Sequence, residues 1–317
     1  MTGARPATAP GSAPVVVRAP ALATAEAPAT AGGLLGEARR SLAEVDSPPL
    51  DSPALDASLL LAHALALPRA ALLARPEMPV GPAERSRFGA LVERRAAGEP
   101  LAWLTGRREF WSLDLEVDPS TLVPRPETER LVEAVLAAMG EMGEREGGGG
   151  PLRVADLGTG CGAVAIAVAR EAAGALVVAT DIDPDALAVA RRNVRRLAPG
   201  RVELRLGSWC APLEAGAWSV IASNPPYLRE DDPHLGADGV CREPRRALVS
   251  GGDGLDAIRA IGAGAGRCLR PGGRLLVEHG AEQGEAVRGA FRAAGLERLR
   301  TLRDLGGRER VTEGTRP

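Results

Sequence analysis

The segment LRVADLGTGCGAVAIAVAREAA, residues 152–173, predicts a strand that runs through a glycine-rich loop directly into a helix. Its glycines allow a ligand to approach the backbone N–H groups at the start of that helix. The pattern Gly158-x-Gly160-x-x-Ala163 satisfies the loose form of the dinucleotide-binding fingerprint, which makes an NAD-dependent enzyme one class to consider. Taken alone, this motif is too common to decide between ligands.

Strand-like and helical segments continue to alternate beyond this unit. The candidate strands are LRVADLG (152–158), ALVVATD (175–181), RVELRLG (201–207), WSVIAS (218–223) and GRLLVEHG (273–280). Helical patterns lie between or after them, for example PDALAVARRNVRRL at 184–197. Alternation of this kind predicts a doubly wound α/β sheet, in which ligands bind at the carboxyl ends of the strands.

Two aspartates near the glycine loop bear on the choice of ligand. Asp156 lies just before the first glycine, and a carboxylate there suits a cationic ligand better than a pyrophosphate. S-adenosylmethionine carries an ammonium and a sulfonium group, whereas NAD carries phosphates. Asp181, at the end of the second strand, is placed to accept hydrogen bonds from ribose hydroxyls, which both ligands possess. The alternative role of capping a helix fits Asp183 better, because it directly precedes Pro184.

Composition excludes several other classes of protein. The chain has 317 residues and a formal net charge of −2, so no basic field indicates nucleic-acid binding. It contains no lysine, which rules out a Schiff-base lysine, a pyridoxal-phosphate anchor and a P-loop lysine. The cysteines and histidines show no metal-ligand or disulfide spacing, and no apolar run is long enough to span a membrane. We therefore expect no metal, no membrane partner and a cytoplasmic location.

The region before the glycine loop divides into three parts. Residues 1–33 are rich in Ala and Pro without periodicity, and they predict a disordered extension. Residues 34–106 carry apolar residues at helical spacings between prolines, which predicts a small helical bundle. Residues 107–150 predict a linker that contains a strand hairpin and a helix. The remaining residues, 151–317, form the predicted α/β domain.

The residues SNPPYL at 223–228 end the fourth predicted strand. Neither proline can donate a ladder hydrogen bond, so the strand must stop there. Asn and Pro are ordinary turn formers, but a rigid turn can also hold a polar group of a substrate. Together with the glycine loop, this motif resembles the Rossmann-type methyltransferases with an Asn-Pro-Pro-Tyr motif. Those enzymes methylate planar nitrogens on adenine, cytosine or glutamine.

The chemistry of that superfamily explains the motif. The lone pair of an amide or aryl amino nitrogen is delocalised, which makes the nitrogen a poor nucleophile. The Asn224 side-chain oxygen and the Pro225 carbonyl can both accept hydrogen bonds from the target NH2 and hold it in line with the methyl group. Pro226 adds rigidity, and the Tyr227 ring can lie against the planar group. No strong base is needed before transfer, because positive charge moves from sulfur to nitrogen and the proton leaves afterwards.

Three further segments resemble one family in particular, the peptide chain release factor glutamine N5-methyltransferases. They are REFWSLDLEVDPSTLVPRPETERLVE (108–133), EPRRALVSGGDGLD (243–256) and RDLGGRERV (303–311). The resemblance implies a Rossmann-like, seven-stranded class I methyltransferase domain preceded by the helical bundle. It also implies methyl transfer from S-adenosyl-L-methionine to the glutamine of the Gly-Gly-Gln motif in release factors 1 and 2. The helical bundle is then most simply a docking surface for the folded release factor.

The resemblance also implies which residues form the site. S-adenosyl-L-methionine would contact Asp156, Gly158, Thr159, Gly160, Cys161, Gly162, Asp181, Trp209 and Asn224. The glutamine would be held by Asn224, Pro225, Pro226 and Tyr227, of which Asn224, Pro225 and Tyr227 form the catalytic group. Trp209 would flank the adenine, although a tryptophan after a strand can equally belong to the core. At Cys161 the family more often has a small hydroxyl residue.

Other functions stay possible at this point, and the roles of Arg125, Glu127 and Glu129 are not assigned. A DNA or RNA adenine N6-methyltransferase would share the Asn-Pro-Pro-Tyr motif, but it should bring a basic groove or a recognition domain. A ribosomal-protein glutamine N5-methyltransferase is harder to exclude, since PRPETE (124–129) favours the release-factor branch by resemblance only. A catalytically inactive binding protein would be expected to lose Asn224 or the glycine loop, and neither is lost.

Overall fold

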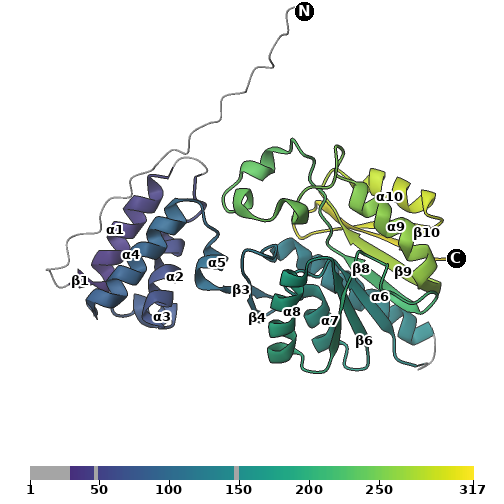
Figure 1. Cartoon of the computed structure of the whole chain (residues 1–317), viewed down its shortest axis with the longest axis horizontal. Coiled ribbons are helices and arrows are strands. Elements are labelled where there is room, and N and C mark those ends of the chain that lie inside the picture. The colour runs from purple at the N-terminus through teal and green to yellow at the C-terminus, as the bar shows by residue number, and fades with distance from the viewer. Residues whose placement is uncertain (1–28, 46–48, 146–149) are drawn as a thin grey trace, which may run out of the picture. The chain divides into compact units, whose positions relative to one another are not determined.

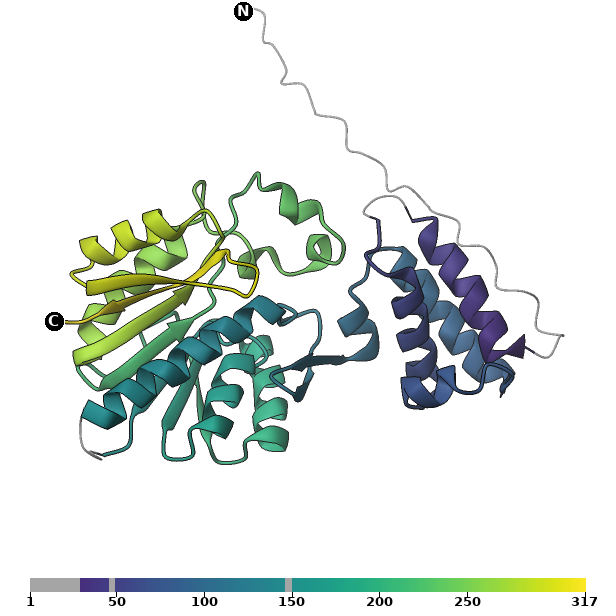
Figure 2. The ribbon, with the colours of Figure 1, turned by 180° about the vertical axis from the view of Figure 1, so that it is seen from behind.

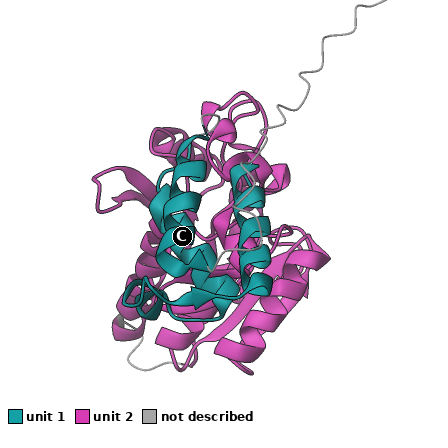
Figure 3. Cartoon of the chain, turned by 90° about the vertical axis from the view of Figure 1, so that its left-hand side faces the viewer, with its two compact units in different colours: residues 1–99 teal, residues 100–317 magenta. Residues whose placement is uncertain are grey.

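The computed structural model describes residues 29–45, 49–145 and 150–317, so most of the predicted extension lies outside the described residues. The chain forms two compact units, Met1–Glu99 and Pro100–Pro317, which Figure 3 distinguishes by colour. The break falls after Glu99, so helix α5 (Leu101–Thr105), which the prediction assigned to the helical bundle, belongs to the second unit. Ala102 of α5 packs into the core of that unit.

Helices make up most of the described part of the first unit, as the spacing of apolar residues predicted. Its helices are α1 (Ala31–Ala43), α2 (Pro53–Leu65), α3 (Arg69–Leu73) and α4 (Pro82–Ala96). Helices α2 and α4 each begin with a proline, which is favourable because the N–H that proline lacks would have no partner in the first turn. Leu34, Leu60 and Phe88 are fully buried between the helices. A buried ion pair joins α2 to α4, with Arg95 Nε 2.7 Å from Asp56 Oδ2.

Residues 29–33 are ordered, although the sequence placed them in the extension. Strand β1 (Ala29–Thr30) pairs with β2 (Pro79–Val80), and the Thr30 hydroxyl caps α1 by accepting a hydrogen bond from the Gly33 N–H at 3.3 Å. A side chain at Gly32 would press against the chain just before β2. These small residues lack periodicity but are held by contacts with a distant segment. The predicted boundary at residue 33 therefore lies too far along the chain.

The second unit is built on a seven-stranded sheet with the order β10-β11-β9-β8-β5-β6-β7. Its strands are β5 (Arg153–Leu157), β6 (Leu176–Asp181), β7 (Val202–Leu206), β8 (Trp218–Ser223), β9 (Leu269–Glu278), β10 (Glu297–Arg303) and β11 (Glu309–Thr315). Neighbours among β5 to β9 are parallel, and β11 is antiparallel to both β9 and β10. The five predicted strands are thus confirmed, as is the seven-stranded sheet. The connection order reverses between β5 and β8, where open α/β sheets bind their ligands.

Helices cover both faces of this sheet (Figures 1 and 2). They are α6 (Glu129–Arg145), α7 (Ala163–Glu171), α8 (Pro184–Leu197), α9 (Asp256–Cys268) and α10 (Gly284–Ala293). Val154 and Val220 belong to the core that contains α6, α7 and α8, whereas the adjacent Ala155 and Ile221 belong to the core that contains α9 and α10. Successive strand residues point to opposite faces, and burial on both explains the near-continuous apolar runs in the sequence.

A short hairpin precedes α6. Strands β3 (Arg107–Phe110) and β4 (Leu113–Glu116) pair as the alternation predicted, and the 3-10 helix η1 (Pro126–Thr128) then leads into α6. The turn residues Trp111 and Ser112 have φ values of 53° and 55°, the left-handed conformation that tight two-residue hairpins require. Between β8 and α9 the chain forms three further 3-10 helices, η2 (Pro233–Gly236), η3 (Val240–Arg242) and η4 (Arg245–Ala247).

Candidate active site

A cavity in the second unit collects most of the residues that the sequence singled out. Its wall includes Asp156, Gly158, Thr159, Gly160, Cys161, Asp181, Trp209, Asn224, Pro225 and Pro226. These residues follow or end β5, β6, β7 and β8, so the cavity lies at the carboxyl ends of the parallel strands. Gly162 and Tyr227 are predicted site residues that do not line it.

The glycine loop owes its path to residues in the left-handed backbone region. Gly158, Gly160 and Gly162 have φ values of 70°, 56° and 89°, which side chains rarely adopt. A Cβ at Gly158 would also lie 3.1 Å from the Trp209 ring. Gly162 faces away from the cavity, since a Cβ there would lie 3.1 Å from Ile166 of α7. Gly162 therefore shapes the turn into α7, and its predicted cofactor contact stays a prediction.

Asp156 is buried beneath this loop. Its Oδ2 atom accepts hydrogen bonds from the Thr159 hydroxyl at 2.6 Å and from the Ala165 N–H at 3.2 Å. Burial raises the pKa of Asp156 to about 6 in spite of these bonds, and the negative charge of Asp181 adds to the shift. The ionised carboxylate is therefore costly in the free protein, and a cationic ligand group beside it would favour it.

Asp181 connects the end of β6 to the glycine loop. Its Oδ2 accepts a hydrogen bond from the Gly160 N–H at 2.9 Å, and its Oδ1 accepts one from the Asp183 N–H at 3.0 Å. Burial raises the pKa of Asp181, although these backbone hydrogen bonds oppose the shift. Asp183 caps α8 by accepting from the Asp185 N–H at 2.9 Å. The capping role thus belongs to Asp183, which leaves Asp181 facing the cavity.

Trp209, which follows β7, and Cys161, in the glycine loop, line the same cavity. The Trp209 ring covers Gly158 and also packs against the core beneath α9 and α10, while its predicted contact with adenine stays a prediction. Its backbone has a φ of 44°, and its carbonyl accepts a hydrogen bond from the Thr180 hydroxyl at 3.3 Å. Burial raises the pKa of the Cys161 thiol to about 12, which keeps that thiol neutral and unreactive.

The Asn-Pro-Pro segment leaves β8 beside the glycine loop. The Ser223 hydroxyl donates to the Leu157 carbonyl at 2.7 Å, which ties the end of β8 to the end of β5. Asn224 Nδ2 donates to the Thr128 hydroxyl oxygen at 3.0 Å. Because the amide NH2 of Asn224 donates to Thr128, the Oδ1 atom of Asn224 is left as an acceptor for a ligand. Pro225 and Pro226 continue the cavity wall.

Tyr227 is held mainly through its backbone. Its N–H donates to the Leu248 carbonyl at 3.1 Å, and its carbonyl accepts from Gln283 Nε2 at 2.9 Å. Gly254, with a φ of 76°, lies so close to the Tyr227 carbonyl that any side chain there would clash. The Tyr227 ring packs with the core beneath α9 and α10, and burial, with the charge of Glu278, raises its pKa. Its predicted role against the substrate amide stays a prediction.

The PRPETE segment contains residues whose roles the sequence left undecided and one residue, Thr128, that the sequence analysis did not identify. Arg125 Nη2 lies 2.8 Å from Glu243 Oε1, whose side chain is buried, and burial raises the pKa of Glu243 to about 7. Glu129 Oε1 accepts a hydrogen bond from the Trp111 N–H at 2.8 Å. Arg125 and Glu129 therefore hold neighbouring segments together. Thr128 was not identified from the sequence, although it lies inside a motif that the sequence had singled out and it lines the cavity.

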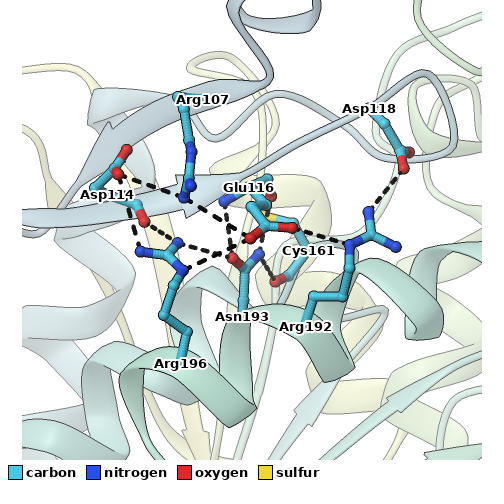
Figure 4. Close-up of polar contacts among 8 residues, drawn as sticks. All are labelled: Arg107, Asp114, Glu116, Asp118, Cys161, Arg192, Asn193 and Arg196. Atoms are coloured by element: carbon cyan, nitrogen blue, oxygen red, sulfur yellow. Dashed lines mark hydrogen bonds and ion pairs between the residues drawn. The ribbon is translucent and has the colours of Figure 1, made fainter.

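One buried amide joins the hairpin, the glycine loop and α8 (Figure 4). Asn193 Nδ2 donates to the Glu116 and Cys161 carbonyls, each at 2.9 Å, and its Oδ1 accepts from the Glu116 N–H at 2.8 Å. On the surface above it, Arg192 pairs with Glu116 and Asp118 at 2.9 and 3.1 Å. Sequence reasoning missed Asn193, because nothing in a helical pattern indicates which polar residue will be buried.

Within the described ranges, no group of histidine, cysteine or carboxylate side chains is arranged to hold a metal ion. Among the described helices, none is both long and apolar enough to cross a membrane.

Comparison with known proteins gives consistent matches for both units. Residues 33–106 match the family model described as PrmC N-terminal domain, and residues 149–255 match the model described as methyltransferase small domain. The second match includes β5 to β8 and the Asn-Pro-Pro segment.

Several curated relatives carry the name release factor glutamine methyltransferase. The relative from Xylella fastidiosa (strain Temecula1 / ATCC 700964) is 48% identical over 263 residues, covering 83% of this chain and 93% of its own. The relative from Burkholderia pseudomallei (strain K96243) is 45% identical over 300 residues, covering 93% of this chain and 99% of its own. The relative from Escherichia coli (strain K12) is 44% identical over 264 residues, covering 83% and 92%.

Among solved structures, the hMettl16 catalytic domain in complex with the MAT2A 3'UTR hairpin 6 matches with a TM-score of 0.51. It is 16% identical and covers 71% of this chain and 81% of that chain. At this identity the likeness shows a shared fold and no more.

Proposed function

Because this chain belongs to the release factor glutamine methyltransferase family, we propose that it methylates a glutamine side chain in peptide chain release factors. The target is the N5 amide nitrogen of the glutamine in the Gly-Gly-Gln motif, and the methyl donor is S-adenosyl-L-methionine. The observation that carries this proposal is the shared cavity, where the Asn-Pro-Pro segment meets the glycine loop, the buried Asp156 and the half-buried Asp181.

The residues around the glycine loop suit the proposed cofactor. S-adenosyl-L-methionine supplies a methyl group on a positively charged sulfur. The Asp156 carboxylate would attract the cationic part of the cofactor, and the burial of this carboxylate strengthens the attraction. Asp181 would accept hydrogen bonds from ribose hydroxyls, while the Trp209 ring, which lines the cavity, would flank the adenine. Gly158, with no side chain, leaves room for the Trp209 ring beside the loop.

The Asn224 and Pro225 oxygens would position the glutamine amide. Its nitrogen is a weak nucleophile, so the protein must hold the nitrogen close to the methyl group and correctly oriented. Asn224 Oδ1 and the Pro225 carbonyl accept hydrogen bonds from the two N–H groups. The proton leaves after methyl transfer, so no strong base is required at the site.

The release factor is the substrate that the similarity to relatives supports, and the reaction belongs in the cytoplasm. The cysteines of the described chain are all free, which agrees with a reducing compartment. The other two substrates considered from the sequence, a ribosomal-protein glutamine and a nucleic-acid adenine, become controls in the test.

Mass spectrometry of an intact release factor, incubated with the protein and S-adenosyl-L-methionine, tests the proposal directly. We expect one added methyl group, located on the Gly-Gly-Gln glutamine. Asn224→Ala should be nearly inactive, because the amide would lose one of its two positioning acceptors. An unmethylated release factor, together with methylation of a ribosomal protein or of DNA, would show that the substrate assignment is wrong.

A further inference from the structure

Thr128 and Glu278 lie next to the Asn224 side chain in the folded chain. Thr128 is the last residue of η1, and its buried hydroxyl oxygen accepts the hydrogen bond from Asn224 Nδ2 at 3.0 Å. Glu278 is the last residue of β9 and is only 1% exposed. In the parallel pairing of β8 and β9, Val277 lies opposite Ser223. Glu278 and Asn224 are therefore the next residues along two adjacent strands.

Two hydroxyl groups of the same region act on the charge of Glu278. The Glu278 carboxyl group has the Thr128 hydroxyl and the Tyr227 phenol beside it, and both favour its ionised form against the effect of burial. Its Oε2 atom is buried and has no hydrogen-bond partner within the part of the chain that the structure describes. An ionised carboxylate only accepts hydrogen bonds, so Thr128 favours the charged Glu278 when it directs its single hydroxyl proton toward that carboxylate. The Thr128 oxygen can then only accept from Asn224, which must present its NH2 group.

We propose that Glu278, acting through Thr128, fixes the direction of the Asn224 amide so that its oxygen is available to the substrate. This inference rests on the proposed function, in which that oxygen accepts a hydrogen bond from the glutamine NH2. A reversed Asn224 amide would present its own NH2 to the substrate NH2, and two donors cannot bond. Thr128 and Glu278 are positioning residues, because they act on the substrate only through Asn224.

The proposal makes the reaction depend on the ionisation of Glu278. Burial raises the pKa of Glu278 to about 7, while Thr128, Tyr227 and the Arg310 guanidinium on β11 oppose the shift and the Glu127 carboxylate in η1 adds to it. A protonated Glu278 can donate to Thr128 instead of accepting from it. The Thr128 proton then becomes free to bond Asn224 Oδ1, which stabilises the reversed amide. Methyl transfer should therefore slow as the pH falls through about 7.

Single-turnover methylation of an intact release factor, with saturating S-adenosyl-L-methionine, tests this dependence. The wild-type rate should rise with pH through an inflection near the Glu278 pKa of about 7 and then level off. Thr128→Val removes the hydroxyl and should slow methyl transfer about ten-fold, whereas Thr128→Ser keeps it and should restore most of the rate. Glu278→Gln can donate as well as accept, so the rate should fall and the inflection should disappear. Calorimetric cofactor affinity should stay within about three-fold of wild type in all variants.

A buried carboxyl elsewhere in the same sheet provides the matched control. Glu313 on β11 is also buried, but it pairs with Arg274 and Arg300 at 2.9 and 2.7 Å. Glu313→Gln should lower the melting temperature and keep the wild-type pH profile. Wild-type rates in Thr128→Val, or an unchanged inflection in Glu278→Gln, would overturn the inference. A wild-type protein that leaves the release factor unmethylated would instead overturn the proposed function.

Discussion

The Asp156 carboxyl group is subject to two opposing effects. Burial disfavours its charge and raises its pKa from 3.8 to about 6, while a cationic ligand beside it would favour the charge. Free-energy linkage then requires that ligand binding and proton release promote each other. Affinity for a positively charged cofactor should therefore be full above the pKa and fall below it.

We predict that the Kd of S-adenosyl-L-methionine increases as the pH falls below about 6, approaching ten-fold per pH unit. Asp156→Asn should bind weakly at every pH and show no inflection, because the titrating charge is gone. Isothermal titration from about pH 5 to about pH 8 measures both. S-adenosylhomocysteine, which lacks the sulfonium charge, should show a smaller pH dependence. A Kd independent of pH in the wild type would contradict a direct role of Asp156.

The same substitution should have the opposite effect on the unliganded protein. A carboxyl group whose pKa is raised on folding stabilises the fold at low pH, and this contribution is lost as the pH rises through about 6. Above that pH, the neutral amide of the Asp156→Asn variant avoids the cost of a buried charge. The melting temperature of this variant without cofactor should therefore equal or exceed that of the wild type.

At the scale of elements, the hairpin β3–β4 is coupled to the glycine loop through α8. Asn193 bonds Glu116 in the hairpin and the Cys161 carbonyl in the loop, so one side chain holds both segments. The pairs that Arg192 forms with the hairpin lie at the surface, where solvent screens them. The buried amide should therefore dominate the energetics of this contact.

Asn193→Ala should reduce the free energy of unfolding by roughly 2–4 kcal/mol, since it leaves buried backbone groups without partners. It should also weaken cofactor binding, because the Cys161 carbonyl loses an anchor. Arg192→Ala is the matched control on the same helix and should cost less than about 1 kcal/mol. Urea denaturation and isothermal titration measure the two effects. Equal destabilisation by both variants would show that the surface ion pairs stabilise the contact between the hairpin and α8 as much as the buried amide does.

At the scale of the whole molecule, the cavity and its chemistry belong entirely to the second unit. The proposed role of the first unit is to dock the folded release factor. Leu55 and Leu73, which are 40% and 48% exposed, line a groove in that unit together with Arg39 and Arg69. Exposed leucines in one groove are suited to bury apolar surface of a protein partner.

We predict that intact release factor is methylated with a much higher kcat/KM than a short Gly-Gly-Gln peptide, because docking adds affinity that the cavity cannot supply. Leu55→Ser and Leu73→Ser should each raise KM for the intact factor several-fold without affecting the reaction of the peptide. Leu176→Ser is the matched control, since Leu176 is similarly exposed but lies at the start of β6. Steady-state kinetics with both substrates measures these effects. Equal efficiency with peptide and intact factor would exclude docking by the helical unit.

Much of the second unit could be predicted because its signals are local. Glycines that need positive φ, prolines that end a strand, and apolar runs of strand or helix length all express preferences within a few residues. The glycine loop, the Asn-Pro-Pro segment and the alternating strands and helices could therefore be recognised from the sequence. The boundary at residue 33 was misplaced for the complementary reason: the order of residues 29–33 comes from pairing with β2, far along the chain.

What only the tertiary structure decided is which polar groups meet and which are buried. Asn224 and Thr128 are 96 residues apart in sequence, and Asn193 and Glu116 are 77 apart, so no local pattern could pair them. The same holds for ionisation, because the pKa values of Asp156 and Glu278 are raised mainly by burial. Composition and local preference thus determined the elements and the motif that bears the chemistry. Long-range packing determined the partners that orient that motif, since desolvation and hydrogen-bond geometry exist only once distant segments are in contact.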